Sequence, residues 1–141
     1  MTQEEKELLL KDLSARLPYN VKLRKYDSLN NYVNNCGDTT DDTLDAKLLY
    51  DIFERQYLGF RPYLRPISSM TEDERNELKE ISSADYITDK YIDFGEFISE
   101  GSPIDFSVIA AVMDWLIAGH FDFRGLIEKG LAIDCTNLNI Y

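Results

Sequence analysis

The segment Phe60–Glu80, FRPYLRPISSMTEDERNELKE, constrains the fold of this chain most strongly. Pro62 and Pro66 lack a backbone N–H, so we expect the residues between them to be extended and poorly able to join a central strand. A helix signal follows, because a hydroxyl three residues before a glutamate can form a capping box. Two residues have that spacing, Ser69 and Thr71. The sequence predicts a helix from about Glu72 to Ile81, whose acidic first turn suits the helix dipole.

The charge of the chain changes at this segment. Residues 1–66 carry 11 acidic and 10 basic side chains, a net charge of −1, whereas residues 67–141 carry 15 acidic and 5 basic ones, a net charge of −10. A surface this acidic repels phosphate backbones, so we expect no direct nucleic-acid binding. The simplest interpretation is a solubilising surface. The alternative is an acidic face that imitates nucleic acid or docks on a basic partner.

Length and composition favour one domain over residues 1–141, because 141 residues, 44% of them hydrophobic, can bury a core of their own. The longest apolar runs, Val108–Met113 and Trp115–Ala118, fall short of the ~20 residues that cross a bilayer. The acidic start, MTQEEKE, is unlike a signal peptide. We therefore expect a soluble, cytoplasmic protein that does not bind membranes. Its oligomeric state is left open.

The N-terminal third predicts one helix and one strand. Thr2 and Glu5 form a capping-box pattern ahead of a helix over about Gln3–Arg16, which Pro18 should end. Alternation over Val21–Tyr26 then predicts a short strand, and the polar stretch Asn30–Asp42 a loop or hairpin tip. Thr43–Tyr57 fits a helix and a strand equally well. Its length and composition favour the helix, whereas at least one strand is what the family resemblance given below implies.

The acidic part predicts further elements. Tyr91–Ile98 alternates like a strand that Gly95 weakens. A helix to Ala118 should follow, capped by Asp105 or Ser107 and ended by Gly119. Three features complete the chain: an Asp122 cap, a short helix over Phe123–Lys129 closed by Gly130, and a final strand at Leu131–Ile133. The elements together predict an α+β fold. It has an N-terminal helix, a small β segment with a barrel-like sheet as one option, and a mainly helical acidic C-terminal part.

Three stretches taken together carry a resemblance: the opening MTQEEKELLLKDLSARLPY, FRPYLRPISSMTEDE, and WLIAGHFDFRGLIEKGLAID. The chain resembles a family of small uncharacterised proteins from gut Bacteroides-type bacteria and their phages or mobile elements. The resemblance covers roughly half of the chain and implies a variable β-rich middle, but no activity. Gly119 stands before His120 where the family has a polar or histidine residue, so no role for a histidine pair carries over.

Little catalytic chemistry is visible. The single histidine, His120, is close to Asp122, but no nucleophile motif accompanies the pair. Neither zinc spacing, nor an EF-hand loop, nor a glycine-rich phosphate loop is present. Cys36 and Cys135 are too few for a disulfide framework, and free thiols are favoured over a single bridge between them. We predict no catalytic residue, metal or cofactor, and a small enzyme is the disfavoured hypothesis.

An aromatic and basic cluster is the candidate binding site. Aromatic rings beside arginines suit partner recognition, although core packing is their commoner fate. The candidate partner-binding residues are Tyr57, Phe60, Arg61, Tyr63 and Arg65. The arginines, including Arg55, are expected to pair with the acidic helix that follows. The preferred function is a non-enzymatic accessory or binding protein of a phage or mobile element, acting on an unknown protein partner. The alternative is an acidic nucleic-acid mimic that inhibits a host nuclease or regulator.

Overall fold

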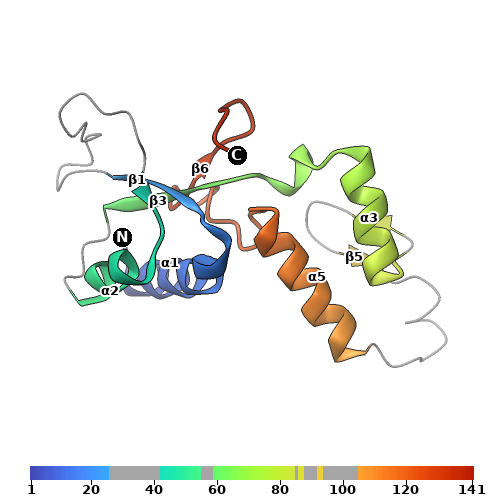
Figure 1. The fold of residues 1–141 in the computed structure, drawn as a ribbon, viewed down its shortest axis with the longest axis horizontal. Helices are drawn as coiled ribbons and strands as arrows, with labels where there is room; N and C mark the ends of the chain where they lie inside the picture. The colour runs from blue at the N-terminus through green and yellow to red at the C-terminus, as the bar shows by residue number, and fades with distance from the viewer. Residues whose placement is uncertain (26–41, 55–58, 85, 88–91, 94–104) are drawn as a thin grey trace. The chain divides into compact units, whose positions relative to one another are not determined.

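The computed structural model describes residues 1–25, 42–54, 59–84, 86–87, 92–93 and 105–141 (Figure 1). It confirms the α+β class. The chain divides into two compact units: unit 1 is Met1–Leu64 with Arg124–Tyr141, and unit 2 is Arg65–Phe123. By sequence, unit 1 carries 13 acidic and 11 basic side chains, a net charge of −2. Unit 2 carries 13 acidic and 4 basic ones, a net charge of −9, so most of the acidic excess belongs to unit 2.

The first helix of unit 1 has its predicted bounds. α1 (Gln3–Arg16) starts with the capping box, in which Thr2 Oγ1 accepts a hydrogen bond from the Glu5 N–H at 3.1 Å. The Glu5 carboxylate in turn accepts from the Thr2 N–H at 2.7 Å. A 3₁₀ turn over Leu17–Tyr19 follows, with Pro18 in its first positions. The proline ends α1 because it cannot donate a backbone hydrogen bond to the helix.

The described strands of unit 1 form a four-stranded sheet in the order β2-β1-β3-β6. They are β1 (Lys22–Lys25), β2 (Asp42–Thr43), β3 (Phe60–Leu64) and β6 (Ile133–Asp134). β1 is antiparallel to β2 and to β3, and β6 is parallel to β3. β1 confirms the strand predicted at residues 21–26. The sheet is open, so the barrel-like option is wrong.

The strand β3 corrects the expectation that its prolines would keep it out of a central position. β3 pairs with β1 on one side and with β6 on the other. Leu64 O accepts from Cys135 N–H on the β6 side at 3.0 Å. Because backbone groups alternate in direction along a strand, Pro62 faces the same side as Leu64. β6 pairs only with Tyr63 and Leu64, so the N–H that Pro62 lacks costs no bond of the β1 ladder.

The last residue of the chain extends the pairing of β1 and β3. The register places Lys22 opposite Tyr63, one pair beyond Leu23 and Pro62. There the Tyr141 hydroxyl bridges the strands, because it accepts from Lys22 N–H at 3.0 Å and donates to Tyr63 O at 3.0 Å. Burial raises the pKa of this hydroxyl well above its usual range, although the residue as a whole is half-exposed. The C-terminal side chain therefore acts as a strand-to-strand link.

The segment Thr43–Tyr57 is mainly helical, which corrects the expectation of a strand. Among the described residues of this segment only Thr43 belongs to a strand, and α2 spans Ala46–Glu54. The helix starts because the Asp45 carboxylate accepts from the Leu48 N–H at 2.7 Å, as an N-cap does. Tyr57 lies outside the described residues, and so does the predicted loop at 30–42 apart from Asp42, which is in β2.

A buried ion cluster joins α1 to the returning C-terminal segment. Asp12 and Arg16 are both fully buried, and Asp12 accepts from Arg16 Nε at 2.6 Å and from Arg16 Nη2 at 3.2 Å. Arg124 Nε also donates to Asp12, at 3.1 Å. The cluster lies beside an apolar core shared by the helices and the sheet of unit 1. That core contains Leu9, Leu13, Val21, Leu23, Leu44, Ile52, Phe60, Leu64, Leu126, Leu131 and Ala132.

The described residues of unit 2 include two helices whose predicted caps are confirmed. α3 (Glu72–Ser82) follows a 3₁₀ turn at Ile67–Ser69 and begins with a capping box between Thr71 and Glu74. α5 (Phe106–Ala118) is capped by Asp105 and ends at Gly119. β4 (Tyr86–Ile87) and β5 (Ile92–Asp93) pair as an antiparallel ribbon, and the rest of the strand predicted at residues 91–98 lies outside the described residues. The core contains Ile67, Met70, Leu78, Ala84, Ile87, Val112, Leu116 and Phe121.

The helix predicted at Phe123–Lys129 is wrong, since these residues form turns. No helix follows Asp122, whose N–H donates to Arg65 O at 2.7 Å next to the isolated bridge between Arg65 and Phe121. Gly125, with φ of 70°, then takes a left-handed conformation that interrupts a helix. The final strand lies at Ile133–Asp134, two residues later than predicted. In the described part of the chain, every helix is too short or too polar to cross a membrane.

Candidate protein-binding surface

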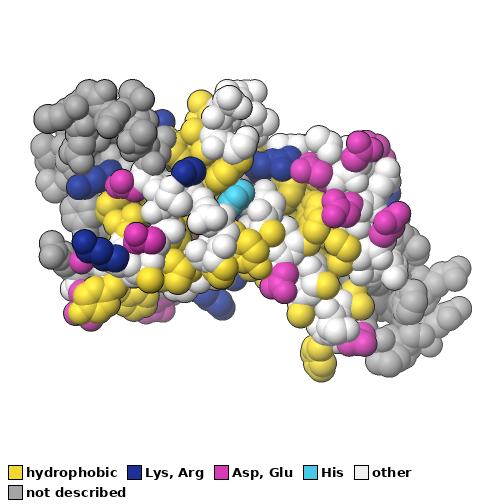
Figure 2. All heavy atoms as spheres, in the orientation of Figure 1, with side chains coloured by type: hydrophobic (Ala, Val, Ile, Leu, Met, Phe, Trp, Pro, Cys, Tyr) yellow, Lys and Arg dark blue, Asp and Glu magenta, His cyan; other side chains and the backbone are white. Residues whose placement is uncertain are grey.

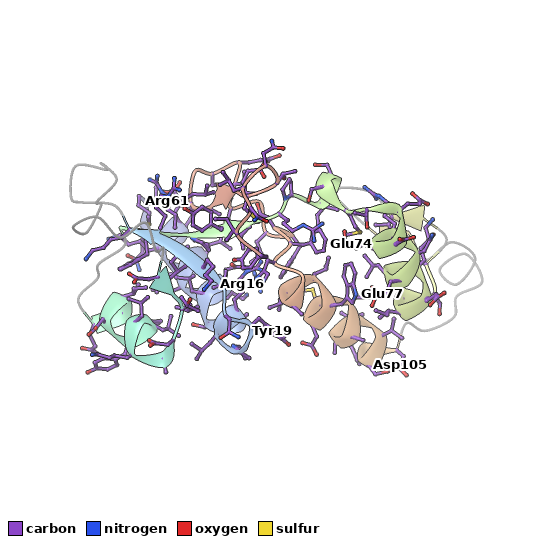
Figure 3. The ribbon with its side chains drawn as sticks, turned by 45° about the horizontal axis from the view of Figure 1, so that its top comes forward. Arg16, Tyr19, Arg61, Glu74, Glu77 and Asp105 are labelled. Atoms are coloured by element: carbon purple, nitrogen blue, oxygen red, sulfur yellow. The ribbon has the colours of Figure 1, made fainter. Side chains whose placement is uncertain are left out.

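The five residues predicted to bind a partner lie in different environments. Phe60 and Tyr63 are buried, at 5% and 0% exposure, in the sheet of unit 1. Arg61, on β3, is partly buried opposite Arg24 (Figure 3). Tyr57 is outside the described residues, and Arg65 belongs to unit 2. The structure therefore does not gather these side chains into one exposed patch, and the two described aromatic rings serve as core.

Arg65 confirms the expectation that an arginine of this segment pairs with the acidic helix. Its guanidinium donates to both carboxylate oxygens of Glu74 on α3, each at 2.8 Å, and lies 4.4 Å from the centre of the Phe121 ring. Hydrogen bonding from Arg65 lowers the pKa of Glu74 to about 2. The Phe121 ring also stacks on Trp115 of α5, with centroids 5.4 Å apart. Arg65 is thus committed to bracing α3 against the core of unit 2.

His120 and the two cysteines were the side chains considered for catalysis or metal binding. In the described ranges, no three His, Cys, Asp or Glu side chains come together in a way that could hold a metal ion. His120 has a positive φ of 59°, and its carbonyl accepts from the Arg65 N–H at 2.8 Å. Cys135 is buried, whereas Cys36 falls outside the described residues. The search for a site therefore turns to the surface.

The most unusual surface is on α5, which is apolar on nearly every side. One face of the helix carries Val112, Leu116 and Trp115, which pack on the core of unit 2. A second apolar row follows at positions i, i+3, i+4 and i+7, and we call it the α5 stripe. The α5 stripe consists of Phe106, Ile109, Ala110 and Met113. A helix with apolar residues all round is normally enclosed, so this second row indicates a face that packs on something else.

The α5 stripe is exposed in the structure. Phe106 is 86% exposed, Ile109 is 42% exposed, and Ala110 next to Ile109 is also exposed. Exposure decreases toward the end of the helix, where Met113 is partly buried and Ile117, one helical repeat further on, is buried. The pattern is sequence-readable, because the spacing follows one side of a helix. The sequence does not show that α3 packs on the side of α5 that carries Val112 and Leu116.

Carboxylates border this apolar row. Asp105, at the start of α5 (Figure 3), accepts from the Ser107 N–H at 2.8 Å, and this bond lowers its pKa. Asp114 is exposed four residues after Ala110, on the edge of the α5 stripe. Unit 2 also carries exposed carboxylates on α3, at Glu72, Asp73, Glu77 and Glu80. Figure 2 shows apolar side chains over α5 and acidic ones over α3 on one face of unit 2.

Comparisons with known proteins add no relative. No protein-family model, no curated protein and no solved structure matches the chain. Function must therefore be argued from the surface itself.

Proposed function

We propose that this chain is a non-enzymatic binding protein, an accessory of a phage or mobile element, and that it acts through protein–protein contact at the α5 stripe. One observation carries the proposal: a phenylalanine at 86% exposure heads an apolar row on a helix whose opposite side is packed. The family resemblance of the sequence supports the setting in a phage or mobile element.

Energetics favour a partner on this face. Burying a phenylalanine side chain contributes roughly 1.5–3 kcal/mol, and an isoleucine a similar amount. Phe106 and Ile109 leave much of that free energy unused in the isolated chain. Scattered exposed apolar residues are ordinary, but contiguous ones mark interaction sites. An aromatic residue flanked by smaller apolar neighbours is also the composition typical of an interface hot spot.

The test is affinity capture from source cells during induction of the element, with wild-type protein, Phe106→Ser and Phe53→Ser. Phe53 is the matched control, because it is an exposed phenylalanine (54%) on α2 of unit 1. We expect a specific partner that wild type and Phe53→Ser retain and Phe106→Ser loses. Recovery of the same partner by all three proteins, or of none by any, contradicts the proposal.

A second candidate function is the acidic nucleic-acid mimic, which the exposed carboxylates of α3 favour. Glu72, Asp73, Glu77 and Glu80 occupy one side of the helix over about 12 Å, from the rise of 1.5 Å per residue. Such a protein would compete with DNA for a basic target. Replacement of the four by glutamine should then abolish competition with DNA, whereas Phe106→Ser should leave it intact. If Phe106→Ser abolishes the competition and the glutamine variant does not, the mimic is contradicted and contact at the α5 stripe remains as the proposed function.

A further inference from the structure

We propose that the α5 stripe docks a basic amphipathic helix of the partner. The inference rests on the proposed function and specifies what binds. It follows from the shape of the apolar row and from the charge around that row.

The shape of the row suits a helix. From Phe106 to Ile117 the apolar side of α5 extends about 17 Å, at 1.5 Å per residue, which is about three helical turns. Phe106, Ile109 and Met113 form ridges, and Ala110 leaves a low point between them. Side chains of a second helix can fill such a gap, because helices pack ridge into groove with an axis separation set by the contact residues. An apolar stripe of matched spacing on the partner would complete the contact.

The charge around the row specifies basic flanks. Unit 2 has a net charge of −9, Asp105 and Asp114 border the α5 stripe, and α3 adds four exposed carboxylates. Lysine and arginine beside the partner's apolar stripe would meet opposite charge, which speeds association and fixes orientation. A second copy of this chain would instead bring another −9 unit against the first. An anionic membrane would be repelled for the same reason, since surface-bound helices carry Lys and Arg.

The test uses two synthetic helical peptides of about 18 residues, long enough to fold on contact. Both carry leucine at helical spacing, and their polar positions are all lysine in one and all glutamate in the other. Affinity for the full chain is measured by fluorescence anisotropy at two salt concentrations. We expect the lysine peptide to bind at least about tenfold more tightly than the glutamate peptide, with affinity that falls as salt rises.

Matched variants assign the site. Phe106→Ser should weaken lysine-peptide binding about tenfold or more, and Phe53→Ser should leave it unchanged. Asp114→Asn should weaken it more than Glu54→Gln, an exposed glutamate on α2 of unit 1. Equal binding of both peptides, with Phe106→Ser still harmful, overturns the basic helix and keeps the binding face. Peptide binding that Phe106→Ser leaves intact overturns both.

Two competing occupants are checked directly with the same protein. Sedimentation velocity over a concentration series reports self-association, and co-sedimentation with vesicles containing phosphatidylserine reports membrane binding. If the chain dimerises and Phe106→Ser prevents dimerisation, a second copy is the occupant and the proposal is overturned. If the chain binds vesicles and Phe106→Ser abolishes this binding, a membrane is the occupant and the proposal is overturned. A monomer that does not bind the vesicles but binds the lysine peptide supports the proposal.

Discussion

The buried pair of Asp12 and Arg16 gives the sharpest test of how unit 1 is held together. Both side chains are fully buried, and the carboxylate accepts hydrogen bonds from Arg16 and from Arg124. Asp12→Asn keeps the size of the side chain but removes the negative charge that Arg16 and Arg124 contact. Breaking a buried ion pair from one side costs about 3–5 kcal/mol, and the amide oxygen that remains places this variant near the lower figure.

A loss of that size is large against the whole stability of a domain, which is about 5–15 kcal/mol. With a urea dependence of about 2 kcal/mol per molar, the unfolding midpoint should fall by about 1.5 M. Far-ultraviolet circular dichroism follows the helices of both units. The single tryptophan, Trp115, lies in unit 2, so its fluorescence separates that unit from α1. Hydrogen exchange over Gln3–Arg16 localises the loss to α1.

The control is Glu4→Gln, which removes an exposed charge from the first turn of the same helix and should cost at most about 1 kcal/mol. The double variant Asp12→Asn with Arg16→Gln removes both charges and should be less damaging than the sum of the two single changes. If Asp12→Asn costs no more than Glu4→Gln, the buried pair does not hold α1 to the C-terminal segment and the reasoning fails.

Three further changes test other contacts. Tyr141→Phe removes the hydroxyl between β1 and β3 and should lower the free energy of unfolding by about 1–2 kcal/mol in urea titration, and an unchanged midpoint contradicts the link. Arg65 lowers the pKa of Glu74 from 4.5 to about 2, so the free energy that this pair contributes should be fully present above pH 4.5 and should decline as the pH falls toward 2. Unfolding followed by Trp115 fluorescence should show this decline in the wild type and a flatter one in Glu74→Gln. Gly119→Ala sets a Cβ 2.8 Å from the ring of Phe121 and should cost about 1–3 kcal/mol, so an unaltered melting temperature contradicts that crowding.

Helix ends were predictable because they depend on neighbouring residues. Thr2, Thr71 and Asp105 each hold the first turn of a helix with bonds that span two or three residues. Such contacts are encoded in short sequence patterns, so α1, α3 and α5 have nearly the predicted bounds. Asp45 holds the first turn of α2 (Ala46–Glu54) with a bond of the same kind, to the Leu48 N–H. The residues of α2 also fit a strand pattern, so the sequence did not decide between the two.

Strand partners were not predictable, because pairing joins residues that are far apart in the chain. Pro62 argues against a central strand because it has no N–H to donate. Its nitrogen faces β6, which lies more than 70 residues later and pairs only with Tyr63 and Leu64, so no ladder bond is lost. The turn after Asp122 has the same origin. The Asp122 N–H donates to Arg65 O, a contact between distant segments that a local capping pattern does not encode. Register rather than composition decides such cases.

The candidate surface was only half readable from sequence. The aromatic residues beside the arginines were predicted for a partner with core packing as the alternative, and the two that the structure describes, Phe60 and Tyr63, are core. The α5 helix was recognised as the most apolar stretch, but apolar residues on every side cannot indicate which side is covered. Packing of α3 against Val112 and Leu116 makes that choice and leaves Phe106 outside.

The way the chain enters and leaves unit 2 explains how one chain can carry both a buried ion cluster and an exposed apolar row. Unit 2 is inserted between β3 and the C-terminal segment of unit 1, and its two ends meet each other. Arg65 N–H donates to His120 O at 2.8 Å, and Asp122 N–H donates to Arg65 O at 2.7 Å. An insertion whose ends are adjacent adds little constraint to its host, because the host needs to span only a short gap. The acidic and apolar surface of unit 2 can therefore change without disturbing the contacts of Asp12, Arg16 and Tyr141 within unit 1.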